Sequence, residues 1–579
     1  MRFSFFAVAL SFFLAASSVQ AADAAAGPPA RVVEWIKSTA LPLSTTEAGN
    51  GFDDLAPLAA KLAGAEVVAL GEDTHGTHEV FQTKHRLIEY FVSELGFSVF
   101  AIEANMPEAR RLNDYVMGGE GDVAALIRGM YFWTWTTTEM RDLVEWMRKF
   151  NTDPAHRAAG RQVQFTGFDM QTPDVASRIA TDFLHKYDQP EFLPKVEAAQ
   201  KAVTSTLGGR DFGVATGRFP VELARGKKVV FSGWIKTEDL QGYAGLWWRA
   251  DTPAQTAAAF DNMQSRGPRG TTDWQRYEVT LPVPADTKNI NFGMLMPGEG
   301  TAWFDDLAIT IDGVPYDPAG AFGFDFEGDA LTGFPVTSRA GYEVSIQPGG
   351  HGGKQALRMK SIAVETLPPE QVLALWTDVE ARIASISVDA GGTMTAAERT
   401  WARQNARLVI QQLGMTAKTS SRDHFMADNV MWLREQNPGA KIVLWAHNGH
   451  VAKREDVMGG ELMKRLGKRF VVFGFASGTG QYRANSRDVP AVVELPLTAP
   501  LPDSVEEACA ATALARFILD LRPSRDAASP AWFFNLPRRH RMIGSMELVG
   551  RAQFQSRTVG AEYDFLIWLS EVRGTEALN

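Results

Sequence analysis

Apolar runs of strand length alternate with amphipathic helices in this chain, and this alternation constrains the fold more than any other feature. The run AEVVALGE at 65–72 precedes a stretch, 79–95, whose apolar residues recur at helical spacing, and FSVFAIEA at 97–104 follows it. A strand, a helix and a second strand in such short succession are typical of a parallel sheet.

The same alternation returns later in the chain. Near-continuous apolar strands between helices indicate a sheet that is covered on both faces. We therefore predict an α/β fold, a mostly parallel sheet flanked by helices. The further helix and strand segments are 139–151 with 161–171, 422–437 with 440–450, and 460–467 with 469–478.

Residues 205–360 interrupt this rhythm. Helical periodicity disappears there, while Gly, Pro, Thr and Trp become frequent, and stretches such as WQRYEVTLPVP alternate in the manner of β-strands separated by turns. This pattern predicts an inserted, jelly-roll-like β-sandwich. The α/β domain would then consist of residues 30–204 and 361–579.

Composition and the N-terminal segment indicate which partners and which cellular location to expect. Of the 579 residues 45% are hydrophobic and 22% are charged, and the net charge of −10 includes no long basic run, which argues against nucleic acid and a membrane surface as partners. Residues 1–21 combine Arg2, an apolar stretch and a small-residue cleavage site, as in a secretory signal peptide. Cys509 is the single cysteine, so no internal disulfide can form. We expect a periplasmic or secreted protein with no membrane span after cleavage.

Polar residues follow the predicted strands where each one ends. Because parallel strands end at one edge of their sheet, and ligands of open α/β sheets bind at that carboxyl edge, we expect these side chains to line one cleft. The residues are Glu72 and His75 after the first strand, Glu103 after the second, Asp169 after the third, and His447 and His450 after the fourth.

Structural interpretations stand beside the functional one. A carboxylate at Glu72 also favours the N-terminus of the following helix, His75 can be satisfied by backbone, and Glu103 can form a structural salt bridge. Asp169 fits a turn or a supporting role as well as a direct one. Three other histidines fit structural roles better: His78, His85 and His424.

Lys84 and Arg422 add cations to this set. At 100° per residue Lys84 falls in the middle of the apolar stripe of its helix, between Val80 and Ile88. Cations seldom face a core unpaired, so we expect a carboxylate to meet Lys84, with Glu72 or Glu103 within reach; the alternative is a lysine that extends along the helix to solvent. Arg422, at the start of its helix, is expected to point into the cleft.

Three kinds of chemistry are open to residues of these types. The pairs His75-x-x-His78 and His447-x-x-His450 could ligate zinc, yet their spacing matches no zinc signature. The chain has no G-x-S-x-G elbow, which leaves water as the nucleophile. A histidine held by a carboxylate can accept a proton from water, and a second histidine or an arginine can stabilise the oxyanion.

Five ordered motifs resemble the erythromycin esterase family: GEDTHGTHE with a following Lys, AIEANMPEARRLNDYV, GFDMQ, SRDHFMADNV and WAHNGHV. The resemblance covers most of 60–204 and 365–570. It implies a hydrolase that needs neither metal nor cofactor and opens an ester or lactone, a macrolide lactone among the candidates, by activated water. It further implies His75 as general base, Glu72 and Glu103 as its acidic neighbours, Lys84 as the basic position, His447 and His450 as a second histidine pair, and Arg422 as the arginine of the R-D-x-x-M-A-x-N segment.

The insert resembles a jelly-roll carbohydrate-binding module, which makes a glycan a second candidate partner. The alternative is a lid or docking surface without a sugar site. A competing hypothesis for the whole chain is therefore a binding protein whose catalytic cleft is idle, and a metal-dependent hydrolase is a third. The tryptophans considered for stacking on sugars are Trp234, Trp247, Trp248, Trp274 and Trp303.

Overall fold

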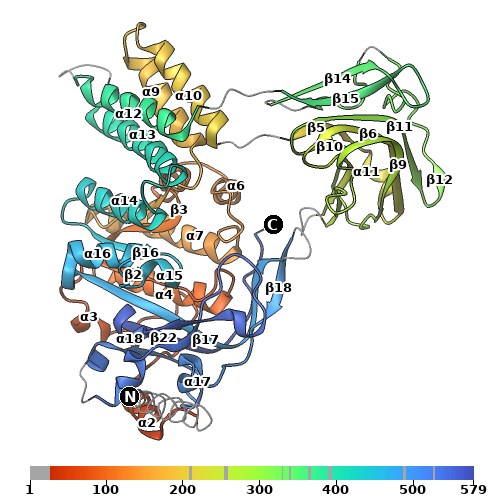
Figure 1. Cartoon of the computed structure of the whole chain (residues 1–579). Coiled ribbons are helices and arrows are strands. Elements are labelled where there is room, and N and C mark those ends of the chain that lie inside the picture. The colour runs from red at the N-terminus through yellow and green to blue at the C-terminus, as the bar shows by residue number, and fades with distance from the viewer. Residues whose placement is uncertain are drawn as a thin grey trace, which may run out of the picture. The chain divides into compact units, whose positions relative to one another are not determined.

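The described residues of the computed structural model group into two compact units. One comprises the residues up to Ala176 together with Arg407–Leu578, and the other comprises Ser177–Ala406. Figure 1 traces the chain through both units by colour. The structure describes residues 27–207, 212–252, 258–328, 330–337, 341–362, 367–388, 394–486, 491–525 and 529–578.

A mostly parallel sheet forms the centre of the first unit, so the predicted fold class is confirmed. Its order is β1-β19-β22-β17-β2-β16-β3-β4, and β18 pairs with β17. The pairs β2–β16, β16–β3, β3–β4, β17–β2 and β17–β22 are parallel. The strands are β1 Leu41–Pro42, β2 Val67–Leu70, β3 Phe97–Asn105, β4 Gln164–Asp169, β16 Lys441–Trp445, β17 Phe470–Asn485, β18 Val492–Pro496, β19 Arg516–Asp520 and β22 Phe565–Val572.

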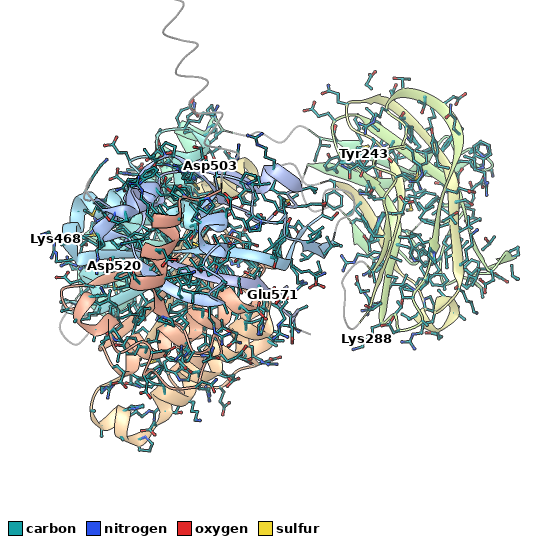
Figure 2. All side chains as sticks on the ribbon, turned by 90° about the horizontal axis from the view of Figure 1, so that it is seen from below. Tyr243, Lys288, Lys468, Asp503, Asp520 and Glu571 are labelled. Carbon is teal, nitrogen blue, oxygen red and sulfur yellow. The ribbon has the colours of Figure 1, made fainter. Side chains whose placement is uncertain are left out.

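The antiparallel pair of β19 and β22 shows at which edge of the sheet the parallel strands end. Asp520, the last residue of β19, pairs with Phe565 at the start of β22, whereas Glu571 lies near the end of β22. Figure 2 shows Asp520 and Glu571 well apart along the sheet. Because β22 is parallel to β17 and β17 to β2, the carboxyl ends of all three strands lie at the edge that Glu571 marks.

The predicted helices of this unit are present, with bounds that differ by at most two residues. Every residue of β2 is buried, as expected for a central strand with both faces covered. Cys509 is buried in a short helix, Val505–Ala510. The helices are α2 Ala30–Thr39, α3 Leu58–Lys61, α4 His78–Ser93, α5 Met106–Val116, α6 Val123–Arg128, α7 Thr138–Thr152, α8 Pro154–Ala158, α14 Arg422–Gln436, α15 Asn448–Val451, α16 Met458–Leu466, α17 Val505–Ala510 and α18 Val559–Glu562.

The second unit holds two antiparallel sheets and a group of helices. One sheet has the order β13-β5-β10-β7-β8 and the other β14-β15-β11-β6-β9, with β12 beside β11. These strands lie within residues 213–361, so the inserted all-β sheets are present where the sequence placed them. The strands are β5 Gly213–Arg218, β6 Lys228–Leu240, β7 Gly245–Asp251, β8 Ala259–Asp261, β9 Gly270–Pro282, β10 Asn289–Met296, β11 Thr301–Ile311, β12 Val314–Pro315, β13 Val336–Thr337, β14 Tyr342–Pro348 and β15 Gln355–Ser361.

Apart from α11 and the last turn of α10, the helices of this second unit lie outside the predicted insert. They belong to the same compact unit as the β-strands because their contacts, such as the bond from the Trp376 indole to the Ala199 carbonyl, are made within it. The insert boundaries at 205 and 360 therefore stay a prediction. The helices are α9 Asp174–Tyr187, which begins just before this unit, α10 Leu193–Leu207, α11 Val221–Ala224, α12 Pro369–Ser385 and α13 Ala396–Thr416, which runs into the first unit.

Within the described residues, no helix combines the length and apolar character that crossing a membrane requires. The predicted signal peptide, residues 1–21, lies outside the described residues, and export stays a prediction.

Candidate active site

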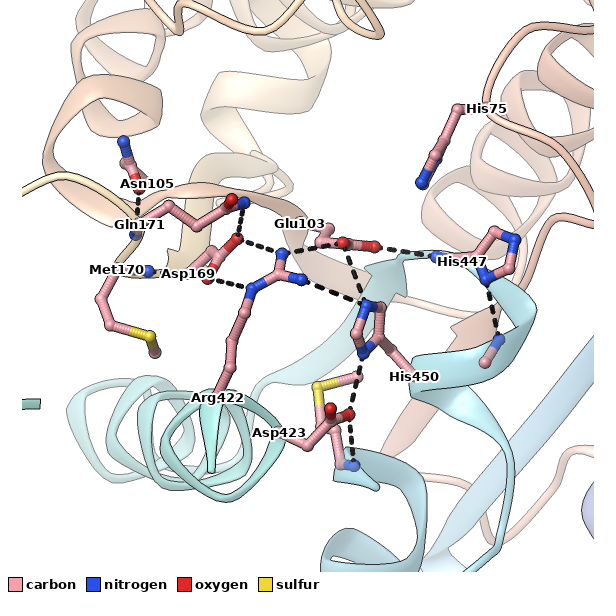
Figure 3. Close-up of polar contacts among 12 residues, drawn as sticks. His75, Glu103, Asn105, Asp169, Met170, Gln171, Arg422, Asp423, His447 and His450 are labelled. Atoms are coloured by element: carbon pink, nitrogen blue, oxygen red, sulfur yellow. Dashed lines mark hydrogen bonds and ion pairs between the residues drawn. The ribbon is translucent and has the colours of Figure 1, made fainter. Parts of the chain in front are cut away.

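The structure brings together the polar residues that follow the parallel strands. The rings of His75 and His447 have their centroids 5.0 Å apart, and those of His447 and His450 are 6.5 Å apart. Glu103 lies beside them but does not end its strand as predicted, because β3 continues to Asn105. Figure 3 shows His75, Glu103, His447 and His450 around one site.

Glu72 is the buried anchor of the first half of the site. Its Oε1 accepts a hydrogen bond of 2.6 Å from His75 Nδ1, and its Oε2 accepts bonds from Lys84 Nζ at 2.6 Å and from the Trp445 indole at 2.8 Å. Burial alone would raise the pKa of Glu72, but the charge of Lys84 and the His75 bond hold it at about 2. Glu72 is therefore ionised and His75 carries its proton on Nδ1.

In the neutral form of the ring, His75 Nε2 is then the nitrogen without a proton. It makes no hydrogen bond to any residue that the structure describes, and 12% of the His75 side chain is exposed. A neutral imidazole with one nitrogen on a carboxylate and the other open to solvent is the arrangement a general base requires.

Lys84 meets a carboxylate, as its position on the helix predicted. Its side chain is fully buried, and its Nζ lies 4.3 Å from the centroid of the Trp445 ring. Burial lowers the pKa of Lys84 to about 8, although the charge of Glu72 acts in the opposite direction. Lys84 thus holds Glu72 in place and does not extend to solvent.

Glu103 joins the two cations of the other half of the site. Its Oε1 accepts a bond of 2.9 Å from Arg422 Nη2 and lies 3.4 Å from His450 Nε2, while its Oε2 accepts the backbone N–H of His447 at 2.9 Å. Burial raises the pKa of this carboxyl, but His450 and Arg422 outweigh it, so the pKa of Glu103 lies far below its usual range. Arg422 is also held by Asp169, through Nε at 3.0 Å and Nη2 at 2.5 Å.

His450 lies between two carboxylates. Its Nδ1 is 2.8 Å from Asp423 Oδ1, and its Nε2 faces Glu103. Burial lowers the pKa of His450, yet the Glu103 charge and the Asp423 bond raise it above its usual value, even though Arg422 Nη1 lies 3.3 Å from Nε2. The two carboxylates therefore favour the protonated form of His450, whose side chain is partly exposed.

His447 differs from the other two histidines because the backbone occupies both of its ring nitrogens. Its Nδ1 accepts the Gly449 N–H at 3.1 Å, and its Nε2–H donates to the Ile543 carbonyl at 3.0 Å. Burial and the neighbouring histidines lower the pKa of His447 to about 3. His447 is therefore a neutral spacer between His75 and His450, without a nitrogen free to exchange a proton with water.

The three histidines expected to have structural roles lie outside this site. His78 pairs with Glu139 at 2.6 Å, and His424 is partly exposed and 3.6 Å from Asp428. His85 is buried in the core, where neither ring nitrogen makes a hydrogen bond to a described residue, although the nearest Glu89 oxygen is 3.5 Å from Nε2. In the described part of the chain, no three His, Cys, Asp or Glu side chains converge in a way that could hold a metal ion.

Several contributors to the site were missed in the sequence. Asp423 adjoins Arg422 in the motif SRDHFMADNV, and that adjacency at a helix start was the available signal. Trp445 ends an apolar strand and looked like core. Gln171, whose Nε2 donates to Asp169 at 2.6 Å, lies in GFDMQ. The Ile543 carbonyl carries no residue-type signal, because any residue supplies a carbonyl.

The fold and the site together define an α/β protein whose sheet edge gathers carboxylates, histidines and an arginine. A family model described as erythromycin esterase matches residues 92–226 and 346–572, more than half of the chain. The chain therefore belongs to the erythromycin esterase family, and membership supports a hydrolase. The matched residues include Glu103, Arg422 and His450, but not the segment with Glu72 and His75.

Individual relatives are more distant. Over 142 residues the chain is 28% identical to the erythromycin esterase type II of Escherichia coli, a match covering 24% of this chain and 32% of that protein. Over 178 residues it is 30% identical to Bacillus subtilis (strain 168) YbfO, named as a hydrolase, covering 31% and 38%. The matches thus span less than half of these relatives. A solved Bacillus cereus structure shares the fold, with a TM-score of 0.58 at 20% identity over 94% of this chain and 98% of that one.

Proposed function

We propose that this protein hydrolyses an ester or lactone with a water molecule activated by His75, without a metal. The observation that carries the proposal is the 2.6 Å contact between His75 Nδ1 and the ionised Glu72, which leaves Nε2 open. His75 Nε2 is thus placed to accept a proton from water.

The reaction needs one proton transfer in each direction. A proton of water moves to His75 Nε2 while the water oxygen attacks the carbonyl carbon, and the carbonyl electron pair moves onto its oxygen. The oxyanion then reforms the carbonyl, and the bond to the alkoxide oxygen breaks. The alkoxide takes the proton back from the His75 imidazolium, which leaves an acid and an alcohol. Arg422, beside His450, supplies positive charge on the opposite side of the site.

Substrate identity is the finer part of the proposal. The Escherichia coli relative is named an erythromycin esterase, which makes a macrolide lactone one candidate substrate. Nothing about the residues of the site requires a macrolide. We therefore propose the class of bond, an ester or a lactone, and treat macrolides as one member of a substrate panel.

A panel of esters and lactones, macrolides included, tests this proposal. We expect the purified full chain to hydrolyse at least one of them, and to keep that activity after dialysis against a chelator, because carboxylates and backbone already occupy most imidazole nitrogens of the site. Elemental analysis of the same sample is the control. Loss of activity with the chelator and recovery with added zinc would establish the metal-dependent alternative. No turnover of any substrate would favour a binding protein with an idle site.

A second activity is supported by one face of the β-sandwich. Trp234, Trp274 and Trp303 are half-buried on the same side of the sheet β14-β15-β11-β6-β9, and Trp303 lies opposite Lys236, whose Nζ is 5.6 Å from its ring centroid. Trp234 stacks on His351 at 3.8 Å between centroids. We propose that this face binds a glycan, since half-exposed indoles beside polar side chains are suited to sugar rings.

Trp248 does not belong to the proposed glycan-binding face, although the sequence made it a candidate for stacking on sugars. It is fully buried in the sandwich core and packs on Phe219 and Phe292, because it points to the inner face of β7. Trp247 points outward from the opposite sheet.

Trp303→Ala is expected to weaken polysaccharide binding about tenfold, a loss consistent with one aromatic contact. Gel electrophoresis of the full chain through soluble polysaccharides measures this as a loss of retardation. Arg249→Ala, on the opposite sheet, is the matched control and should migrate like wild type. Unretarded wild-type protein in every polysaccharide tested would refute the glycan proposal.

A further inference from the structure

A segment far along the chain contacts the turn His447–His450 at two points. The Ile543 carbonyl accepts the Nε2–H of His447 at 3.0 Å. Three residues earlier His540, at the end of β20 Arg538–Arg541, places its Nε2 3.4 Å from the side-chain nitrogen of Asn448. The segment His540–Ile543 therefore braces the turn that carries His450.

The orientation of the Asn448 amide is set by the backbone of β17. Its Nδ2 donates to the Phe475 carbonyl at 2.8 Å, and its Oδ1 accepts the Phe475 N–H at 3.1 Å. Its own N–H donates to the carbonyl of Glu72 at 2.8 Å. Because exchanging the oxygen and the nitrogen of this amide would break both bonds to Phe475, the nitrogen must face His540.

This orientation determines which nitrogen of His540 carries the proton. Nε2 faces an N–H donor, so it must be the acceptor, and Nδ1–H donates to Glu506 Oε1 at 2.8 Å. Glu506 and His540 are both fully buried, and the same Glu506 oxygen accepts the backbone N–H of Arg541 at 2.8 Å. The result is a continuous line of hydrogen bonds from Glu506 through His540 to Asn448.

We infer that Glu506 and His540 are positioning residues of the active site, which act through Asn448 to set the orientation of the turn His447–His450. This inference rests on the proposed hydrolysis for its kinetic consequences, but the geometry itself does not depend on it. Neither residue touches a reacting atom. Without the hydrogen bonds from Glu506 through His540 to Asn448, the turn His447–His450 shifts. His450 is then misplaced relative to Glu103 and His75.

The charged groups around His540 make its hydrogen bond to Asn448 depend on the protonation state of His540. Besides Glu506 it faces the acids Asp73 and Glu562, and the Tyr563 ring lies 6.0 Å from it. Burial lowers the pKa of His540, while Glu506 and the other acids raise it above its usual value. A second proton, on Nε2, would set one N–H against another at Asn448. Arg541 adds a positive charge nearby that opposes this protonation.

His540→Leu tests the inference, because it removes both hydrogen bonds and keeps an apolar side chain in the core. We expect kcat to fall about 10- to 100-fold while KM changes less than about threefold, since a small misplacement of catalytic groups acts mainly on the chemical step. His540→Gln, which offers Asn448 an acceptor again, should recover part of kcat. If His540→Leu fails to fold, the comparison of His540→Gln with wild type carries the test.

The matched control is His85→Leu, which removes another buried histidine of the same unit, one whose ring nitrogens make no hydrogen bond within the described residues. It should leave kcat and KM unchanged. Nitrogen-15 NMR of the histidine side chains provides a readout that needs no substrate: in wild type His540 should carry a proton on Nδ1, and His540→Leu should shift the His447 and His450 signals. Unchanged signals and unchanged kcat would overturn the inference. Shifted signals in a protein without any ester hydrolysis would support it and contradict only the proposed function.

Discussion

Replacing His75 with alanine is expected to lower kcat/KM for ester hydrolysis about 10³-fold, within the range that a general base supplies. The variant keeps Glu72 paired with Lys84 and Trp445, so the fold should survive. The loss should appear mainly in kcat, because proton abstraction occurs in the transition state and not on binding. Initial rates on the best ester of the panel measure it.

His78→Gln is the matched control for this experiment. His78 lies three residues along the chain and also bonds a carboxylate, Glu139, but it does not join the site. The His78→Gln protein should therefore hydrolyse the ester at close to the wild-type rate. A His75→Ala protein that retains wild-type kcat/KM, with circular dichroism showing a native fold, would remove His75 from the mechanism.

Replacing Lys84 with methionine is expected to lower the free energy of unfolding by about 3–5 kcal/mol at pH 7 to 8, because it leaves the buried Glu72 charge without its cation. Activity should fall as well, since an unpaired Glu72 takes up a proton and no longer orients His75. Urea unfolding followed by tryptophan fluorescence measures the first effect.

The pH dependence of the stability lost in Lys84→Met follows from the direction in which the pKa of Glu72 is shifted. In wild type the folded pKa of Glu72, about 2, lies below its ordinary value of 4.5, so its stabilisation is complete above pH 4.5 and is lost as the pH falls toward 2. In Lys84→Met burial acts without the cation and raises that pKa above its ordinary value. The folded variant then binds the proton more tightly than the unfolded chain. The difference in stability between the two proteins should therefore shrink from pH 8 to pH 4.

A double-mutant cycle isolates the pair. Glu72→Gln combined with Lys84→Met removes both charges and should recover much of the stability that either single change loses. Additive losses would show that Lys84 and Glu72 do not stabilise one another, and a Lys84→Met protein as stable as wild type at pH 8 would contradict the predicted buried ion pair.

Part of this site could be found by reading the chain. The strand after which Glu72 and His75 come, and the helical phase that puts Lys84 on the apolar stripe, are local patterns of hydrophobicity with a fixed period. These patterns are sufficient to place the three residues near one sheet edge. The carboxylate that Lys84 requires follows from the free energy of burying an unpaired charge.

Other parts could not be found this way. His447 and His450 are equivalent in the motif WAHNGHV, yet one is neutral and enclosed by backbone and the other is paired with two carboxylates. That difference depends on Ile543 and Asp423, which reach the turn from distant segments. His540 gave no signal at all, because its partner Asn448 is about 90 positions away and neither belongs to a periodic pattern.

The sequence alone determined the parallel α/β sheet, the inserted β-strands and the edge at which acids and imidazoles gather, because each depends on patterns that repeat within a few residues. Only the tertiary structure decided which nitrogen of each histidine carries a proton, since that choice depends on donors and acceptors, several of them backbone groups, brought together from segments far apart in the chain.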